Sequence, residues 1–400
     1  MNLTTGYPYA LITNGLPATY PKLEKSIKTD VVIIGGGISG ALTAYYLTNA
    51  GIECIVVDGR TIGLGSTCGN TSLLQYELDK PLSTLSEQIG IKDAEYVYKL
   101  SSRSIDTLES IITKIKFNHF ERQESLFFAA QSKDVLLLEA EFNYRRKAGF
   151  DVEWLTENNI KKQFGLNAPS AILSTQGATT DAYLLTHALL QYSQKKGLKV
   201  FDRTRVTEVN YYPRSVKLNT ANECTISARN IVNATGYEVT EFIDQKIINL
   251  SSTYAIASEH LSDESLPWKR KALLWNTADP YLYMRLTADH RMIIGGRDEE
   301  FHSARKRDAL IRRKTALLKK DFERLFPGVE FVPEFSWTGV FGSTKDALPF
   351  IGIYPKTPHT YYALGFGGNG ITFSVIAAEM IRDMLLGKKN KRQELFSFSR

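Results

Sequence analysis

Residues Gly35 to Gly40 are the first group whose types and spacing suit a chemical task, because they match the pattern G-x-G-x-x-G. A β-branched run, 30–35, leads into them, and Asp58 ends the next such run, eighteen residues after Gly40. In a strand–helix–strand unit, these glycines allow a tight turn and bring backbone N–H groups close to a pyrophosphate, while the acid accepts ribose hydroxyls. The pattern predicts a dinucleotide site. The alternative is a glycine-rich turn without a ligand.

A second glycine cluster, Gly365 to Gly370, also follows a strand-like run, 361–365, and precedes a helical run, 371–386. No further strand follows, so this cluster cannot be a second dinucleotide unit. Because a helix N-terminus attracts negative charge, the backbone N–H groups from Gly368 to Thr372 are predicted to face an anionic group. The alternative is a capped core helix with a flexible entry.

Alternating strands and helices are predicted to position these glycines. A charged, helix-periodic region at 81–147 and alternating segments at 247–297 interrupt them and predict a second, largely antiparallel part. We therefore expect two interleaved domains. The predicted strands are 30–35, 52–58, 199–201, 205–211, 231–234, 281–286, 291–295 and 361–365, and the predicted helices are 41–50, 94–115, 181–196, 304–326 and 371–386.

The composition of the 400 residues limits the possible function classes. A net charge of +6, partly from the tail Lys388, Lys389, Lys391 and Arg392, is too mild and too local to indicate a nucleic-acid-binding protein. Three scattered cysteines indicate neither a disulfide framework nor a metal site, and no metal is expected. The apolar run 31–50 contains glycines and polar residues, so we predict a cytoplasmic protein without a transmembrane segment.

The order of the motifs along the full chain resembles the FAD-dependent amino-acid-oxidase family. This family includes glycine and sarcosine oxidases, D-amino-acid dehydrogenases and γ-glutamylputrescine-type amine oxidases. Five blocks carry the resemblance: the fingerprint with Asp58 and Arg60, then 63–70, 204–206, 233–236, and the C-terminal pair 337–352 and 365–372.

The resemblance implies an α/β fold in which a doubly wound, Rossmann-like FAD-binding domain is interleaved with an α+β substrate domain that contains a largely antiparallel mixed sheet. The predicted FAD domain comprises 1–80, 175–247 and 337–400, and the substrate domain 81–174 and 248–336. FAD is expected to lie between them, with the second glycine cluster near the negative pyrimidine end of the reduced ring. The predicted cofactor-binding residues are Gly35, Gly37, Ile38, Ser39, Gly40, Asp58, Gly59, Arg60, Gly65, Ser66, Thr67, Val206, Ala234, Thr235, Gly236, Gly339, Gly368, Asn369, Gly370, Ile371 and Thr372.

FAD is expected to be non-covalent, because no cysteine follows Cys224 and no histidine lies between the fingerprint and His119. Cys68, in the block that would face the ring, is the one position that leaves a covalent link open. On the substrate side, Arg285 stands where relatives grip a carboxylate, and the candidate walls of the pocket are Tyr254, Tyr283 and Trp337.

The resemblance implies oxidation of the C–N bond of a small amino acid or secondary amine. Hydride would pass to flavin N5, the imine would hydrolyse, and oxygen or a quinone-type carrier would accept the electrons. One alternative is a flavoenzyme acting on an amine carried by a macromolecule such as modified tRNA, and another is a non-catalytic flavin-binding protein. An NAD-dependent dehydrogenase is disfavoured because it would leave the second glycine cluster without a purpose.

Overall fold

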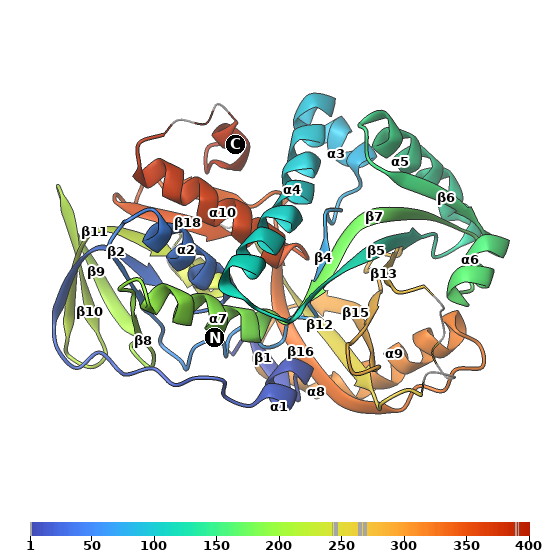
Figure 1. Ribbon diagram of the computed structural model, residues 1–400, viewed down its shortest axis with the longest axis horizontal. Helices are drawn as coiled ribbons and strands as arrows, with labels where there is room; N and C mark the ends of the chain where they lie inside the picture. Colours follow the sequence, from blue (N-terminus) through green and yellow to red (C-terminus); the bar gives the residue numbers. More distant parts are fainter. Residues whose placement is uncertain are drawn as a thin grey trace.

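Two β-sheets lie side by side in the computed structural model, which describes residues 2–241, 243, 247–262, 266, 270–388, 390 and 392–400 (Figure 1). Lys389 and Lys391 of the basic tail lie outside these residues. An eight-stranded sheet occupies the left of Figure 1 and a ten-stranded sheet the right. The long helix α4 (Ile91–Ile115) stands between them and contacts α7, α10 and β7.

The eight-stranded sheet has a parallel core of buried, β-branched strands. A sheet of this kind needs apolar residues on both faces, and β3 accordingly has four buried residues in a row. Its strands, in spatial order, are β17 (Phe350–Ile353), β18 (Thr360–Leu364), β11 (Thr225–Asn233), β2 (Ile27–Ile34), β3 (Cys54–Val57) and β8 (Lys199–Phe201), with the hairpin β9 (Val206–Tyr212) and β10 (Ser215–Thr220) beside β11.

Helices α2 (Ile38–Asn49), α7 (Ala182–Gln194) and α10 (Gly370–Leu385) cover this sheet as one layer, with α2 contacting both others (Figure 1). Helix α2 is apolar on nearly all sides because it is packed between its neighbours and the sheet. The fingerprint prediction of strand, helix and strand is confirmed by β2, α2 and β3.

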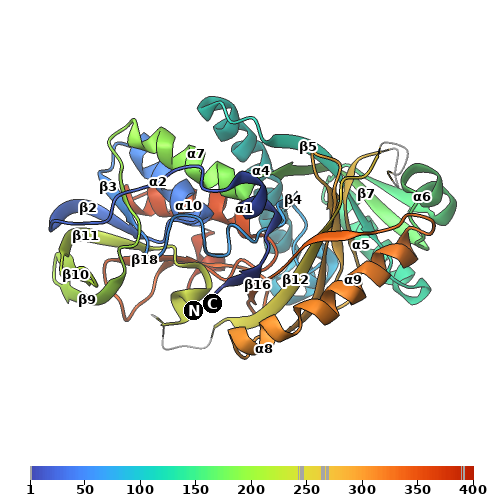
Figure 2. The same cartoon turned by 90° about the horizontal axis from the view of Figure 1, so that it is seen from below.

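The ten-stranded sheet is largely antiparallel, with one parallel pair, β13 with β5. This sheet and the parallel one together confirm the predicted fold class. Helix α9 (Ile311–Leu325) packs against the neighbouring strands β16, β12 and β15 of this sheet, as Figure 2 shows. Its strands are β1 (Thr4–Gly6), β16 (Pro333–Ser343), β12 (Asn249–Ser258), β15 (Met292–Glu300), β14 (Tyr283–Leu286), β13 (Ala272–Asn276), β5 (Phe120–Phe128), β7 (Ser170–Thr180), β4 (Leu73–Gln75) and β6 (Val152–Thr156).

The remaining helices are α1 (Tyr9–Asn14), α3 (Leu82–Ile89), α5 (Val135–Lys147), α6 (Glu157–Phe164), α8 (Ala304–Ala309) and α9 (Ile311–Leu325). Two predictions were wrong in detail. The region 81–147 is not all helical, because the charged segment around Glu121 is the start of strand β5, which pairs with β7 and β13. The single helix predicted over 304–326 is divided at Leu310 into α8 and α9.

The division into domains remains a prediction. The sheets themselves assign β1, β4 and β16 to the ten-stranded sheet, although most of their residues fall within the predicted FAD domain. Within the described parts of the chain, no helix is long and apolar enough to cross a membrane.

Candidate active site

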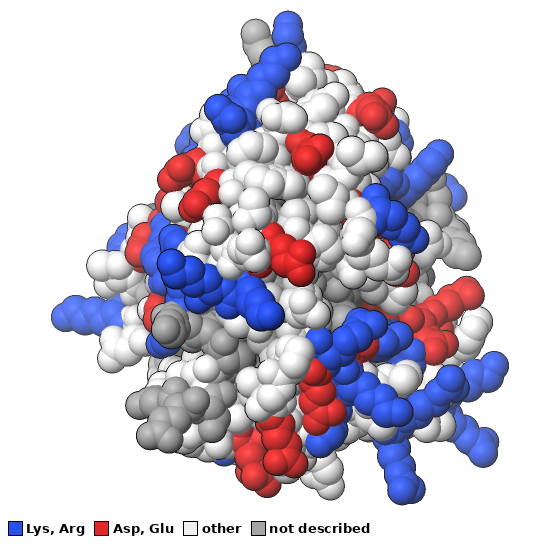
Figure 3. All heavy atoms as spheres, turned by 90° about the vertical axis from the view of Figure 1, so that its right-hand side faces the viewer, with Lys and Arg blue, Asp and Glu red and all other residues white. Residues whose placement is uncertain are grey.

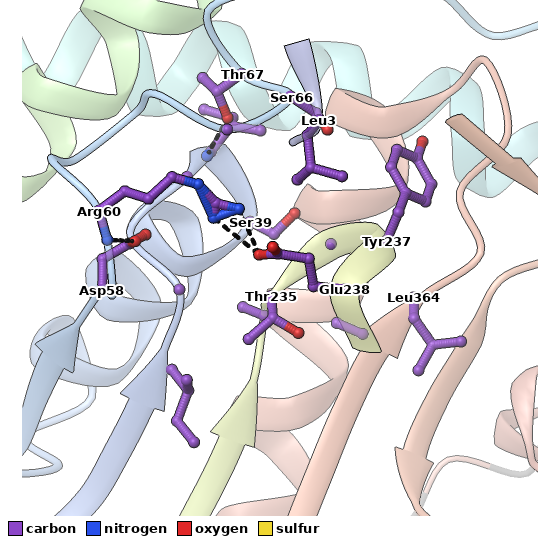
Figure 4. A pocket seen from close by; sticks show the side chains of 18 of the residues that line it. Leu3, Ser39, Asp58, Arg60, Ser66, Thr67, Thr235, Tyr237, Glu238 and Leu364 are labelled. Carbon is purple, nitrogen blue, oxygen red and sulfur yellow. Dashed lines mark hydrogen bonds and ion pairs between the residues drawn. The ribbon is translucent and has the colours of Figure 1, made fainter. Parts of the chain in front are cut away.

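A cavity of about 430 Å³ opens at the carboxyl ends of the parallel strands β2, β3 and β11, where ligands of doubly wound sheets bind. Figure 4 shows its lining side chains, which come from elements far apart in the sequence. The predicted cofactor residues among its lining are Gly35, Gly37, Ile38, Ser39, Asp58, Gly59, Arg60, Gly65, Ser66, Thr67, Val206, Ala234, Thr235, Gly236 and Gly370.

The fingerprint residues have distinct structural tasks. Gly35 has a φ of +109°, which a side chain would strain, and it turns the chain from β2 toward α2. Gly40 is not part of the cavity lining, since a Cβ there would lie 1.9 Å from the Gly35 carbonyl oxygen. The first N–H group of α2, that of Ile38, donates to Thr67 Oγ1 at 3.1 Å. The N-cap residue Gly37 has no side chain to cap the N–H groups that follow, so these are available to a ligand.

Asp58 forms part of the cavity wall and organises the loop around it. Its Oδ2 accepts a hydrogen bond from the Gly36 N–H at 2.7 Å, and its Oδ1 accepts one from the Arg60 N–H at 2.8 Å. Burial raises the pKa of this carboxyl, while the two backbone N–H groups act against that rise. In Figure 4 the Arg60 side chain crosses toward Glu238, with which it forms an ion pair at 2.5 Å.

A smaller cavity of about 140 Å³ adjoins the first one and lies against the ten-stranded sheet. Both cavities have Ser66, Asn70, Tyr237 and Gly370 in their walls, so the two spaces meet there. The other residues that line this second cavity are Thr4, Gly69, Thr71, Leu73, Gln75, Thr253, Tyr281, Tyr283, Asp298, Gly339, Val340, Phe341, Gly367 and Gly368.

The polar groups around the second cavity are linked in two sets. Asp79 accepts hydrogen bonds from the Gly368 N–H at 3.0 Å and from the Tyr281 hydroxyl at 3.1 Å, which ties the second glycine cluster to the segment that precedes β14. The Tyr283 hydroxyl lies 3.3 Å from Thr253 Oγ1. Burial raises the pKa of both tyrosines, which therefore stay protonated hydrogen-bond donors.

Only one of the four predicted substrate residues, Tyr283, is part of the cavity lining. Arg285 is buried but donates from Nε to the Thr71 carbonyl at 2.5 Å, and Trp337 donates from Nε1 to the Gly69 carbonyl at 2.9 Å. These two side chains brace the segment 69–71, which lines the second cavity. The Tyr254 hydroxyl donates elsewhere, to the Arg307 carbonyl at 3.2 Å.

The predicted C-terminal residues also differ in their placement. Gly339 and Gly368 line the second cavity, whereas Asn369, Ile371 and Thr372 are not in the lining of either cavity. Asn369 donates to the Glu77 carbonyl at 2.8 Å and so holds the entry of α10 against the chain after β4. The predicted stabilisation of an anionic group by these N–H groups remains a prediction.

Several wall residues were missed in the sequence. Asp298 stands in the run Arg297 to Glu300, which resembles an exposed charged strand end. Asp79, which lies behind the wall against Gly367 and Gly368, stands in an ordinary loop. Tyr281 belonged to a predicted strand but was not given a role, and Glu238 carries no motif. Only the pairing of β15 with β12 and β14 brings Asp298 to the cavity.

The electrostatics of Asp298 lead to a stability prediction. Burial, followed by the nearby Asp79 and Asp279 carboxylates, raises its pKa to about 7, against the effects of the Thr253 hydrogen bond and the Lys314 charge. A raised carboxyl pKa means that the folded state loses stability as pH rises from about 4 to about 7. We expect Asp298→Asn to raise the free energy of unfolding by about 2 kcal/mol at pH 8, because one pKa unit corresponds to about 1.4 kcal/mol. At pH 4 the two proteins should match in urea denaturation, and an equal gain at both pH values would contradict this assignment.

Comparison with known proteins agrees with this architecture. Residues 30–384 match the model of the DAO family, described as FAD dependent oxidoreductase. The chain belongs to this family. It is therefore a member of a family of FAD-dependent oxidoreductases, as the motifs predicted.

Relatives of this DAO-family chain include two curated enzymes. It is 25% identical to the gamma-glutamylputrescine oxidoreductase of Escherichia coli (strain K12), covering 92% of this chain and 86% of that one. It is also 25% identical to the glycine oxidase of Bacillus licheniformis, covering 92% and 96%. The fold matches a crystal structure of L-proline dehydrogenase from P. horikoshii, with a TM-score of 0.77, 19% identity and coverage of 93% and 97%.

The larger cavity of this DAO-family protein suits FAD on structural grounds. It offers the open N-terminus of α2, the Asp58 carboxyl and the buried Ser66 Oγ, which has no hydrogen-bond partner within the protein. A pyrophosphate would be received by the first of these groups and a ribose by the second. The Ser66 hydroxyl, at the wall that the two cavities share, is free to donate to a ligand there.

Proposed function

We propose that this protein binds FAD non-covalently and oxidises the carbon beside the nitrogen of a small amino acid or amine. One observation carries the proposal: the cavity suited to FAD and the second cavity meet at Ser66, Asn70, Tyr237 and Gly370. A substrate in the second cavity would thus lie next to a cofactor in the first. By their names, two relatives act on gamma-glutamylputrescine and on glycine.

The bound FAD would supply the two-electron acceptor, which takes a hydride at N5. The chain has to hold the substrate close, exclude water and leave the amine neutral. Tyr237, Tyr281 and Tyr283 wall the second cavity with apolar rings, and their pKa values are all raised by burial. The resulting imine hydrolyses in water, so no side chain has to act as an obligate acid or base.

Non-covalent binding is supported by the state of Cys68. Its Sγ donates to the Gly65 carbonyl at 3.2 Å, and burial raises the pKa of the thiol to about 11. A thiol in this state is a poor nucleophile, because the thiolate is the reactive form. Cys68 is also not among the residues that line either cavity.

The test is an absorption spectrum of the purified protein before and after acid precipitation, followed by anaerobic addition of amines and amino acids. We expect oxidised-flavin bands that move to the supernatant and that bleach with one compound class. A protein that cannot be loaded with FAD, or a loaded protein that no amine or amino acid bleaches, would refute the proposal. The electron acceptor is then identified by adding oxygen or a quinone-type carrier to the bleached protein and observing which of the two restores the oxidised-flavin bands.

The tRNA alternative finds no support on the face shown in Figure 3. Acidic side chains lie among the basic ones there, and no continuous basic stripe crosses it. A cytoplasmic location remains a prediction.

A further inference from the structure

The second cavity has an unusual charge composition for a site that would receive an amino acid. Among the described residues that line it, Asp298 is the only Asp, Glu, Lys, Arg or His. A substrate carboxylate would therefore meet an acidic side chain and no basic one. Recognition of a substrate carboxylate would require a positively charged side chain in the cavity wall.

One carboxylate oxygen of Asp298 lacks a hydrogen-bond donor. Its Oδ1 is buried and has no hydrogen-bond partner within the protein. A buried carboxylate oxygen without a donor is costly, and a donor supplied by a ligand would remove that cost. The nearest cation on the neighbouring helix, Lys314, is engaged with Glu299 at 2.6 Å and with the Arg297 carbonyl, also at 2.6 Å.

A second carboxylate reinforces the negative charge of the site. Asp79 lies directly behind the wall formed by Gly367 and Gly368, and it also holds the Tyr281 hydroxyl. Burial raises the pKa of the Asp79 carboxyl, and Asp79 in turn raises the pKa of Asp298, so a cation in the cavity would favour the ionised form of both groups. Both therefore bias the cavity toward a cation.

The remaining walls also suit a cation. Tyr281, Tyr283 and Phe341 present aromatic rings, whose faces attract positive charge. A positive charge from Arg285, the predicted carboxylate ligand, would reverse this preference for a cation. Its guanidinium instead donates to the backbone carbonyls of Thr71 and Leu286. Arg285 therefore stabilises the wall of the second cavity and is not among the residues that line it.

We propose that Asp298 recognises a second, protonated nitrogen of the substrate, so that the preferred substrate is a short diamine and not an amino acid. This inference rests on the proposed function, which accounts for oxidation at the first nitrogen. With FAD bound, the C–H bond beside the neutral amine would break and its hydride would go to the flavin, and water would then convert the resulting iminium ion into an aldehyde and ammonium. The distal ammonium stays paired with Asp298 throughout, and oxygen or a quinone-type carrier takes the two electrons afterwards.

The first test compares three amines of similar length that differ at the far end, using the FAD-loaded enzyme without oxygen. 1,4-Diaminobutane carries a distal ammonium, butylamine a methyl group and 4-aminobutanoate a carboxylate. We expect kcat/KM for flavin bleaching to fall on the order of 100-fold from the diamine to butylamine, as for loss of a desolvated charge pair, and further for 4-aminobutanoate. A similar value for all three, or a preference for 4-aminobutanoate or glycine, overturns the inference.

The second test uses Asp298→Asn, which keeps the shape of the side chain but removes its charge. It should lower kcat/KM for the diamine on the order of 100-fold and leave butylamine nearly unchanged. The matched control is Glu300→Gln, which removes a charge at an exposed position on the same strand and leaves the Lys314–Glu299 pair intact, so it should leave both values unchanged. Equal losses for diamine and butylamine in Asp298→Asn would contradict charge recognition.

A binding measurement separates recognition from turnover. Calorimetry with 1,4-diaminobutane on enzyme whose FAD is already reduced should detect binding to the wild type and to Glu300→Gln but not to Asp298→Asn. If the flavin bleaches with amines but the diamine neither binds better nor depends on Asp298, this inference fails while the proposed function stands. If no amine bleaches the flavin, the proposed function itself fails.

Discussion

Replacing Gly37 by valine is expected to weaken FAD binding strongly while leaving the chain folded. Gly37 has a φ of −82°, which any residue adopts, so the backbone itself tolerates the change. Its Cβ, however, would lie 2.9 Å from Thr67 Oγ1, at the cavity wall and at the open N-terminus of α2. Crowding of this kind costs about 1–3 kcal/mol, so we expect affinity to fall on the order of 100-fold. Fluorescence titration of the apoprotein with FAD measures the change.

The matched control for this change is Thr43→Val on the same helix. Thr43 is buried, bonds only within the helix to the Ser39 carbonyl at 2.8 Å, and is not a lining residue of either cavity. Thr43→Val should bind FAD as the wild type does. Wild-type affinity in Gly37→Val would show that the fingerprint turn is not where the cofactor binds, whereas a lowered melting temperature of the Gly37→Val apoprotein would indicate misfolding instead.

Arg145→Met is expected to cause the largest loss of stability. Its side chain is fully buried and bonds to Glu141 at 2.7 Å and to Glu77 at 3.1 Å. Glu141 in turn accepts the backbone N–H groups of Leu82 and Ser83 at the start of α3. Removal of the arginine leaves two buried carboxylates without a cation, which should lower the free energy of unfolding by about 3–5 kcal/mol in urea denaturation.

The dependence on pH distinguishes this mechanism from a simple loss of packing. Without Arg145, the buried carboxyl groups of Glu77 and Glu141 hold their protons more tightly in the folded state, so the loss should be larger at pH 8 than at pH 5. Arg146→Met is the control, because Arg146 is exposed on the same helix and should change stability by less than about 0.5 kcal/mol. An equal loss at both pH values would assign the effect to packing.

Much of the cofactor side was predictable because it depends on local sequence. A G-x-G-x-x-G turn, a buried β-branched strand and an apolar helix each have a short-range signature, and β2, α2 and β3 follow it. The substrate side was less predictable. The start of β5 reads as a charged helix, and it is a strand because β7 and β13 supply its hydrogen bonds.

The roles of individual side chains were the hardest feature to predict from the sequence. The sequence determined which family the chain belongs to, the fold class and the position of the turn that opens the larger cavity, because those features repeat along neighbouring residues. Only the tertiary structure decided that Arg285 braces Thr71 and that Asp298 reaches the second cavity. Both outcomes depend on strand register between β12, β14 and β15, which joins residues far apart in the chain and leaves no local pattern.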